Sequence, residues 1–311
     1  MKEHLKILMA LDGSDPSLTA ARYISRVISK QFEVVLFHVE AEVPEAFRDM
    51  NVDPATGQQE YPLGIWKVHQ KELVDEFMGK AFDIFVTAGF AHESVSIKYR
   101  SLKSGIARDI LNESYQDYNA LIMGRTGNNK IDGIIPGSVA AKLVEAVAHI
   151  PIVVVGDTPD SNKILVAFDG SKGSMESVNC VRNLLDPHIC ELRLCHVIRP
   201  LSMEPLSTEK PFVSEHETQW IEANKRKIVP AILEATKLLT DAGFSEDRIS
   251  HEILTDEKSR AAAIIKAARA GGYDSIVLGR RGYTTVREFH IGRVSRKILH
   301  FAYQPALWIV N

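Results

Sequence analysis

Three glycines and a serine stand at a spacing that suits the binding of an anion by the backbone. Gly124-Arg125-Thr126-Gly127 is followed, after nine residues, by Gly137-Ser138. An apolar run at 120–123 precedes the segment, and apolar residues at helical spacing follow it. Because glycine has no Cβ, main-chain N–H groups can approach phosphate oxygens, and the first turn of a helix adds free N–H groups. The segment therefore suits a phosphate-binding loop, although the same glycines would serve an ordinary turn between a strand and a helix.

The same spacing recurs 155 positions later, which identifies an internal repeat. Gly279-Arg280-Arg281-Gly282 is again followed by a third glycine, Gly292, after nine residues. The apolar positions of the two helical patterns also correspond at this offset, namely Val139, Leu143 and Val147 with Val294, Ile298 and Ala302. The repeat predicts two similar units, residues 1–156 and 163–311, joined by a polar linker.

Composition and charge exclude several classes of protein. The chain has 311 residues, of which 45% are hydrophobic and 25% charged, and its net charge is −3. That balance does not favour nucleic acid or an anionic membrane as a partner. We find no signal-peptide layout and no apolar stretch near the roughly 20 residues that span a bilayer, so we expect a cytoplasmic protein.

The cysteines agree with a reducing compartment. There are three, Cys180, Cys190 and Cys195, and an odd, sparse count does not suit a disulfide framework. His188 and His196 lie near two of them, but the spacing matches no common zinc pattern. We interpret the cysteines as buried thiols and predict no metal site.

The order of apolar runs and turn residues predicts an alternation of strands and helices. In the first unit we expect strands at 6–11, 32–39, 94–99, 120–123 and 151–155, and in the second at 163–168, 192–197, 249–254, 275–278 and 306–310. We expect a helix capped by Asp15, with Pro16 in its first turn. Further helices are expected at 65–88, 105–114, 214–242 and 260–270, and after each glycine loop. The Pro-containing segments at 40–63 and 199–213 read as irregular, the first as a lid or a mobile excursion.

Such an alternation predicts an α/β fold with parallel sheets and helices on both faces. Ligands of these sheets bind beyond the carboxyl ends of the strands, where the winding direction reverses. Asp12-Gly13-Ser14 follows the first strand of the first unit, and Asp169-Gly170-Ser171 follows the first strand of the second. These turns and the glycine loops should share that edge.

Taken in order, these residues resemble the universal stress protein family. Ala-Leu-Asp-Gly-Ser at 10–14, Phe-His-Val-Glu at 37–40 and Gly-x2-Gly-x9-Gly-Ser after the fourth strand carry the resemblance, which covers nearly the whole chain as two tandem copies. It implies two five-stranded, Rossmann-like domains of the adenine nucleotide alpha hydrolase-like kind. It also implies that the fifth strands pair the domains into a pseudo-dimer within one chain.

In the nucleotide-binding branch of that family the glycine loop holds the phosphates. Carried over to this chain, the resemblance implies a site made by Asp12, Val39, Gly124, Gly127, Gly137, Ser138 and Val139. Asp12 would lie near the ribose, or would simply cap its own turn, and the backbone of Val39 would meet the adenine edge. The implied ligand is ATP or AMP, with or without Mg²⁺.

The second unit keeps most of the pattern and departs from it at one position. Its candidate residues are Asp169, Val197, Gly279, Gly282, Gly292 and Arg293. Arg293 stands where the binding branch has Ser or Thr. It could pair with a phosphate, fill the pocket or face outward. Arg280, Arg281 and Arg296 make this edge basic, although a few arginines are often only solvated surface.

Three functions remain open from the sequence. The first is an adenine-nucleotide-binding regulator of the stress response, acting through mobile segments, protein partners or a homodimer. The second is a scaffold whose glycine loops are only structural. The third is an enzyme, but the chain has no Gly-x4-Gly-Lys-Ser/Thr loop, so we expect at most slow ATP hydrolysis and no catalytic residue. His38 and His196 occupy matching places on the second strands, and we interpret both as structural.

Overall fold

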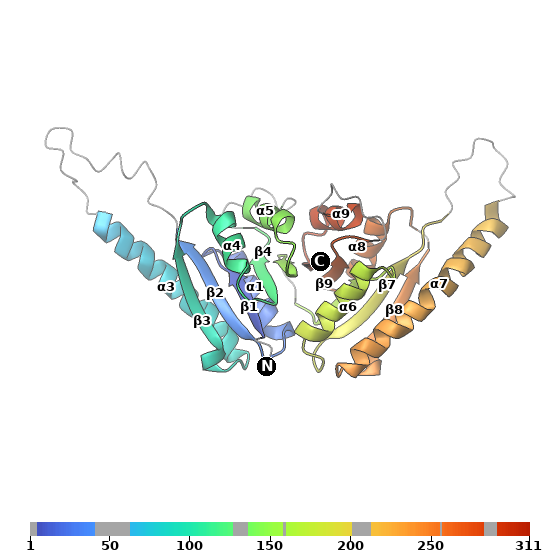
Figure 1. The fold of residues 1–311 in the computed structure, drawn as a ribbon, viewed down its shortest axis with the longest axis horizontal. Helices are drawn as coiled ribbons and strands as arrows, with labels where there is room; N and C mark the ends of the chain where they lie inside the picture. The colour runs from blue at the N-terminus through green and yellow to red at the C-terminus, as the bar shows by residue number, and fades with distance from the viewer. Residues whose placement is uncertain are drawn as a thin grey trace, which may run out of the picture.

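The computed structural model describes residues 5–40, 63–126, 136–157, 160–200, 213–255, 257–282 and 291–311. Gly127 lies outside the described residues, as do nearly all of the predicted irregular segments at 40–63 and 199–213. The two halves of the chain form similar units that lie side by side, with the long helices α3 and α7 at opposite ends (Figure 1).

The first unit runs from β1 to β5. Its elements are β1 (Lys6–Ala10), α1 (Asp15–Val27), β2 (Glu33–Glu40), α3 (Leu63–Thr87), the 3₁₀ turn η1 (His92–Ser94), β3 (Val95–Ser101), α4 (Ile106–Ser114), β4 (Ala120–Gly124), α5 (Ser138–Ala146) and β5 (Ile152–Val155). Every strand predicted in this unit is present, with bounds that differ by at most two residues.

The second unit repeats that order. Its elements are β6 (Lys163–Ala167), α6 (Lys172–Leu184), β7 (Glu191–Val197), α7 (Val213–Asp241), η2 (Glu246–Arg248), β8 (Ile249–Leu254), α8 (Arg260–Gly271), β9 (Ser275–Gly279), α9 (Arg293–Phe301) and β10 (Ala306–Val310). Among the described helices, none is long and apolar enough to cross a membrane.

The prediction that Asp15 caps the first helix was wrong. The cap is Ser14, whose backbone is extended and whose Oγ accepts a hydrogen bond from the N–H of Ser17 at 3.4 Å. Ser14 is itself held by the side chain of Asp12, which leaves Asp15 as the first residue of α1. An acidic residue in the first turn still complements the positive end of the helix.

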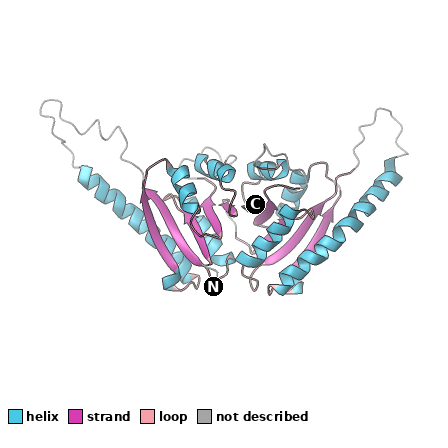
Figure 2. Ribbon diagram, viewed as in Figure 1, coloured by secondary structure: helices cyan, strands magenta, loops and turns pink. Residues whose placement is uncertain are grey.

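The strands form one ten-stranded sheet in the order β3-β2-β1-β4-β5-β10-β9-β6-β7-β8. Neighbouring strands within each unit are parallel, and β5 and β10 pair antiparallel at the centre, with Val153 opposite Trp308. The fifth strands therefore join two five-stranded sheets within one chain, as the resemblance implied. Figure 2 shows helices in front of and behind the strands of both units.

The inner strands of the sheet are buried on both faces because helices cover both, and successive side chains of a strand point to opposite faces. The edge strands β3 and β8 are largely exposed or half-buried. Ile7 and Met9 pack in one core layer with residues of α1, α3, α6 and α7. Leu8 and Ala10 pack in the other with residues of α4, α5, α8 and α9. This double burial explains the continuous apolar runs by which the inner strands are recognised.

Side chains also cross between the units at the central strands. The indole Nε1 of Trp308 on β10 donates to Tyr23 Oη on α1 at 2.8 Å. The Tyr23 hydroxyl lies 2.6 Å from Ser275 Oγ on β9. All three side chains are buried. We call this region, together with the β5–β10 pair, the joint.

Candidate functional site

The carboxyl ends of β1, β2 and β4 bring the predicted residues of the first unit to one edge of the sheet. Ala10, the last residue of β1, pairs with Phe37 on β2 and with Met123 on β4. Asp12, Val39 and Gly124 each follow one of these partners by one or two positions. Because the chain leaves β1 toward β2 and returns on its other side as β4, this edge is the point where the winding reverses.

The turn after β1 is held by the carboxylate of Asp12. Its Oδ1 accepts from the backbone N–H of Ser14 at 3.1 Å and from Ser14 Oγ at 2.5 Å. Gly13 has a φ of 85°, a conformation that favours glycine. Asp12 thus makes the hydrogen bonds expected of a residue that caps its own turn. It is nevertheless exposed at the edge of the site.

Val39 lies on β2 beyond the last pair that β2 makes with β1. Its side chain is buried, and the neighbouring His38 places Nδ1 2.8 Å from the carbonyl oxygen of Leu11. His196 makes the same 2.8 Å contact with Phe168 O in the second unit. Each histidine therefore ties the end of its strand to the turn after the neighbouring strand, which agrees with the structural interpretation.

The start of the glycine loop packs directly on the first turn of α1. A Cβ added to Gly124 would lie 3.2 Å from both the carbonyl carbon and the oxygen of Pro16. One residue on, the carbonyl oxygen of Arg125 accepts from the N–H of Gly137 at 2.8 Å. Glycine at 124 thus permits a close approach, and the bond from Gly137 fixes where α5 begins.

The N-terminus of α5 has no side-chain cap from the part of the chain that the structure describes. Gly137 is its N-cap and supplies no side-chain hydrogen bond to the N–H groups of the first turn, from Ser138 onward. Ser138 is exposed and Val139 half-buried. A helix N-terminus of this kind attracts anions.

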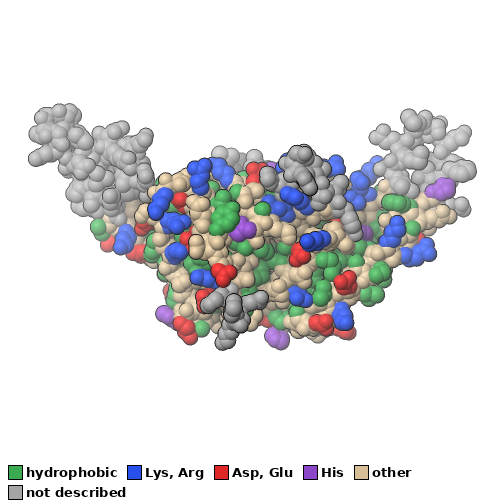
Figure 3. Space-filling view, viewed as in Figure 1, with side chains coloured by type: hydrophobic (Ala, Val, Ile, Leu, Met, Phe, Trp, Pro, Cys, Tyr) green, Lys and Arg blue, Asp and Glu red, His purple; other side chains and the backbone are tan. Residues whose placement is uncertain are grey.

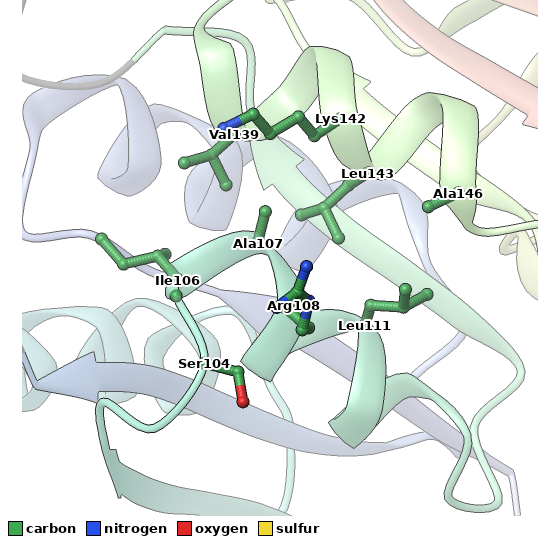
Figure 4. Close-up of a pocket in the computed structure, with 10 residues that line it drawn as sticks. Ser104, Ile106, Ala107, Arg108, Leu111, Val139, Lys142, Leu143 and Ala146 are labelled. Carbon is green, nitrogen blue, oxygen red and sulfur yellow. The ribbon is translucent and has the colours of Figure 1, made fainter.

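A groove of about 470 Å³ adjoins this turn on the side of α4. Ile106, Val139 and Leu143 line it, as do Arg108 and Lys142 (Figure 4). Val139 belongs both to the groove and to the predicted site. The first turn of α5 is therefore flanked by an apolar surface that carries two cations.

The second unit repeats the arrangement. Ala167 pairs with Cys195 and with Leu278, so Asp169, Val197 and Gly279 meet at the matching edge. Asp169 Oδ1 accepts from the N–H of Ser171 at 3.0 Å. A Cβ added to Gly282 would lie 2.9 Å from Asp169 Oδ2, so the glycine loop passes against this carboxylate. Gly292 is the N-cap of α9, again without a side-chain cap.

Three arginines lie around the second site. Arg293 is exposed at the first position of α9, where a positive charge opposes the helix dipole. Burial lowers the pKa of Arg260, and so does the charge of Arg199, whereas Asp169 raises it. Figure 3 shows Lys and Arg side chains along the part of the surface where α5 and α9 lie. Arg293, Arg260 and Arg199 therefore add positive charge at the second site.

Arg280 is not part of a solvated surface. The residue is 4% exposed, and its guanidinium donates to the carbonyl oxygens of Val144, at 2.8 Å, and Val147. Arg125, at the matching position of the first loop, is 1% exposed and donates to Ala302 O and Leu299 O. No local pattern marks these pairs, but the 155-residue offset between Arg125 and Arg280 could have.

The cysteines are buried free thiols, as the sequence predicted. Burial raises the pKa of each of the three thiols to about 12. Within the described part of the chain, no group of three or more His, Cys, Asp or Glu side chains could hold a metal ion.

Comparisons with known proteins agree with the fold and the repeat. The model of the Universal stress protein family matches residues 4–156 and again 161–309. The universal stress protein YxiE of Bacillus subtilis is 30% identical over 147 residues, which is 47% of this chain and 97% of that protein.

Two solved structures are similar over nearly the full length. One is a universal stress protein from Archaeoglobus fulgidus, with a TM-score of 0.59 and 14% identity, covering 100% of this chain and 99% of that one. The other is a protein of unknown function from Pseudomonas aeruginosa, with a TM-score of 0.57 and 14% identity over 98% of this chain and 92% of that one. At such identity they support the fold alone.

Proposed function

Because the chain belongs to the universal stress protein family, we propose that it is an adenine-nucleotide-binding regulatory protein whose better site lies in the first unit. The observation that carries the proposal is the N-terminus of α5, which no described side chain caps, at the edge where the sheet reverses its winding. A helix end without a side-chain cap offers N–H groups and a positive dipole to a phosphate.

The predicted residues would then take the following roles. The backbone at Gly124, Gly137, Ser138 and Val139, with the Ser138 hydroxyl and with Gly127 in the same loop, would hold the phosphates of ATP or AMP. The exposed Asp12 carboxylate would accept hydrogen bonds from ribose hydroxyls, and the backbone of Val39, on the side of β2 that extends beyond its pairs with β1, would meet the base. Any Mg²⁺ would arrive with the phosphates, since it keeps most of its ligands as phosphate oxygens and water.

The second site should differ in affinity and preference. Arg293, Arg260 and Arg199 add positive charge at the second site. The residues 155 positions earlier, in the first unit, are uncharged. Since each added phosphate charge gains more from such a site, we expect the second unit to favour ATP over AMP more strongly than the first does.

The alternatives are a scaffold that binds no nucleotide and a slow ATPase. The scaffold agrees with the observation that Asp12, His38 and Gly124 all make structural contacts. Hydrolysis would require a group that activates water, and the buried His38 ring, engaged at Nδ1 with Leu11, is poorly placed for that role. We therefore expect occupancy, rather than turnover, to carry the signal to protein partners.

The test is calorimetric titration of the nucleotide-stripped protein with ATP and with AMP. We expect micromolar binding with a stoichiometry of one or two per chain, and phosphate release near background. A folded protein that binds neither nucleotide would contradict the proposal and leave the scaffold. Turnover well above background that is lost in Asp12→Ala would favour the enzyme.

Ser138→Asp separates binding from folding. A carboxylate in the first turn favours the helix dipole, so α5 should be no less stable, but it repels phosphate. We expect the first-site affinity to fall at least tenfold while the thermal midpoint is kept. Ser96→Asp adds the same charge at an exposed position of β3, near the opposite edge of the sheet, and should leave binding unchanged.

A further inference from the structure

In each unit, one arginine side chain reaches across to the other unit. Arg125 follows the first glycine of the first loop, and its side chain crosses the joint to the C-terminal end of α9, with Nη1 3.2 Å from Ala302 O and Nη2 2.5 Å from Leu299 O. Arg280 crosses the other way, to Val144 O and Val147 O at the end of α5. Every donor and acceptor in one set lies 155 residues from its counterpart in the other.

These contacts have a clear physical basis. The last carbonyls of a helix have no partner within the helix, and that end carries the negative pole of the dipole. A guanidinium supplies positive charge and paired donors in a fixed plane. Burial lowers the pKa of Arg125 and of Arg280 to about 10, which leaves both charged at neutral pH.

The backbone of each arginine accepts a hydrogen bond from the start of the helix in its own unit. Arg125 O accepts from Gly137 N at the start of α5, and Arg280 O accepts from Gly292 N at the start of α9, both at 2.8 Å. Four contacts therefore close a ring: Arg125 to the start of α5, the end of α5 to Arg280, Arg280 to the start of α9, and the end of α9 back to Arg125. Each helix has nine residues and is about 13 Å long, so the ring is short and fully described.

The ring joins the two helix ends to which the proposed function assigns phosphate binding. We propose that Arg125 and Arg280 are positioning residues that couple the two nucleotide sites, so that occupancy of one unit raises the affinity of the other. The inference rests on the proposed function. A phosphate at the start of α5 favours the aligned helix, and the aligned helix holds Arg280, whose backbone sets the start of α9. The second ligand then has fewer groups to order, so its binding costs less conformational entropy.

The ring is not symmetric. Arg280 Nε donates to Asn311 Oδ1, and Asn311 Nδ2 donates to Ile150 O at 2.6 Å. Arg125 Nε is buried without a partner among the described residues, because the position that corresponds to Asn311 is Gly156. A side chain at 156 would not fit, since its Cβ would lie 2.2 Å from Gln304 O. The link through Arg280 is therefore the firmer one.

The experiment isolates the first site and observes the second unit. Arg293→Asp places a carboxylate at the start of α9 and repels phosphate there, so ATP added to this variant occupies the first site only. Hydrogen exchange is then followed in peptides that cover 275–282 and 291–302. We expect ATP to slow their exchange about threefold, although they lie in the other unit.

Variants of the ring should remove that response. In Arg293→Asp combined with Arg280→Lys, which keeps the charge but loses the fork, we expect the slowing to vanish and the first-site affinity to fall about fivefold. Asn311→Ala removes the third hydrogen bond of Arg280, together with the bond from Asn311 Nδ2 to Ile150 O, and should give an intermediate effect in a chain that folds. Arg296→Lys changes an exposed arginine of α9. It should change neither the slowing of exchange nor the first-site affinity.

The outcomes distinguish the inference from the function beneath it. ATP binding with slowed exchange confined to the first unit would overturn the coupling and leave the nucleotide site standing. The same slowing in the Arg280→Lys variant would show that the signal does not travel through the ring. If the unaltered protein binds no ATP, both the coupling and the proposed nucleotide-binding function are wrong.

Discussion

The hydroxyl of Tyr23 is buried where elements of both units meet. It accepts from Trp308 Nε1 and bonds Ser275 Oγ, so Tyr23→Phe would leave two buried polar groups without a partner. We expect the free energy of unfolding to fall by about 1–3 kcal/mol, measured by urea denaturation. Tyr99→Phe removes an exposed hydroxyl that bonds Asp75 and should cost about 0.5 kcal/mol or less. Equal losses in the two variants would contradict the role assigned to Tyr23.

The imidazole of His196 should make stability depend on pH. Burial lowers its pKa below the ordinary value, opposed by the hydrogen bond to Phe168 and the charge of Asp169. The unfolded chain therefore takes up the proton first as pH falls. The contribution is fully present above about pH 6.5, the unfolded value, and is lost as pH drops through the lower folded value.

His196→Gln should flatten that dependence. The free energy of unfolding between pH 7.5 and 5 should fall less steeply in this variant than in the unaltered protein. His251→Gln, at an exposed position of β8, serves as the control and should keep the original slope. Parallel curves for the unaltered protein and His196→Gln would show that His196 is not the group responsible.

Single residues differ in how far sequence could place them. The glycines and Asp12 were predicted because a close approach or a turn restricts the residue type, and that restriction shows in the spacing. The partners of Arg280, Val144 and Val147, lie 136 and 133 residues away along the chain. A contact that distant leaves no local pattern, so the arginine read as surface.

At the scale of elements, each glycine loop packs against the first turn of a helix. The two units differ in how closely they pack there, and so in how well a side chain would be tolerated. A Cβ on Gly279 would lie 2.7 Å from Gly173 O, whereas one on Gly124 would lie 3.2 Å from Pro16. We expect Gly279→Ala to lower the free energy of unfolding by about 1–3 kcal/mol, since backbone must move. Gly124→Ala should cost less, as measured by the same urea titration. The reverse order would contradict the packing described for α6.

Much of the order of elements was accessible because the inner strands, buried on both faces, are continuous apolar runs, and the repeat supplied each run twice. Helix starts were harder. Ser14 and Asp15 are both good caps, and the choice depends on Asp12, which binds Ser14 through its own carboxylate. Local propensity cannot weigh such a contact, so the boundary was misplaced by one residue.

At the scale of the whole molecule, the joint should make the two units unfold together. β5 and β10 pair through the centre of the sheet, and Trp308 is fully buried there. With Trp66 and Trp220 replaced by Phe, emission from Trp308 reports the joint and circular dichroism reports all helices. We expect the two urea transitions to coincide. An earlier loss of Trp308 emission would mean that the units separate before they unfold.

The pairing of β5 with β10 has a consequence for how the two copies can change. Since both strands belong to one chain, the linker at 156–162 keeps them at an effective concentration on the order of millimolar, and dilution does not part them. In a symmetric dimer every substitution appears twice, once in each subunit. Here a substitution enters one copy only. Ser138 against Arg293, and Gly156 against Asn311, are differences of this kind. Each copy can therefore change independently of the other, with no loss of the contact that holds them together.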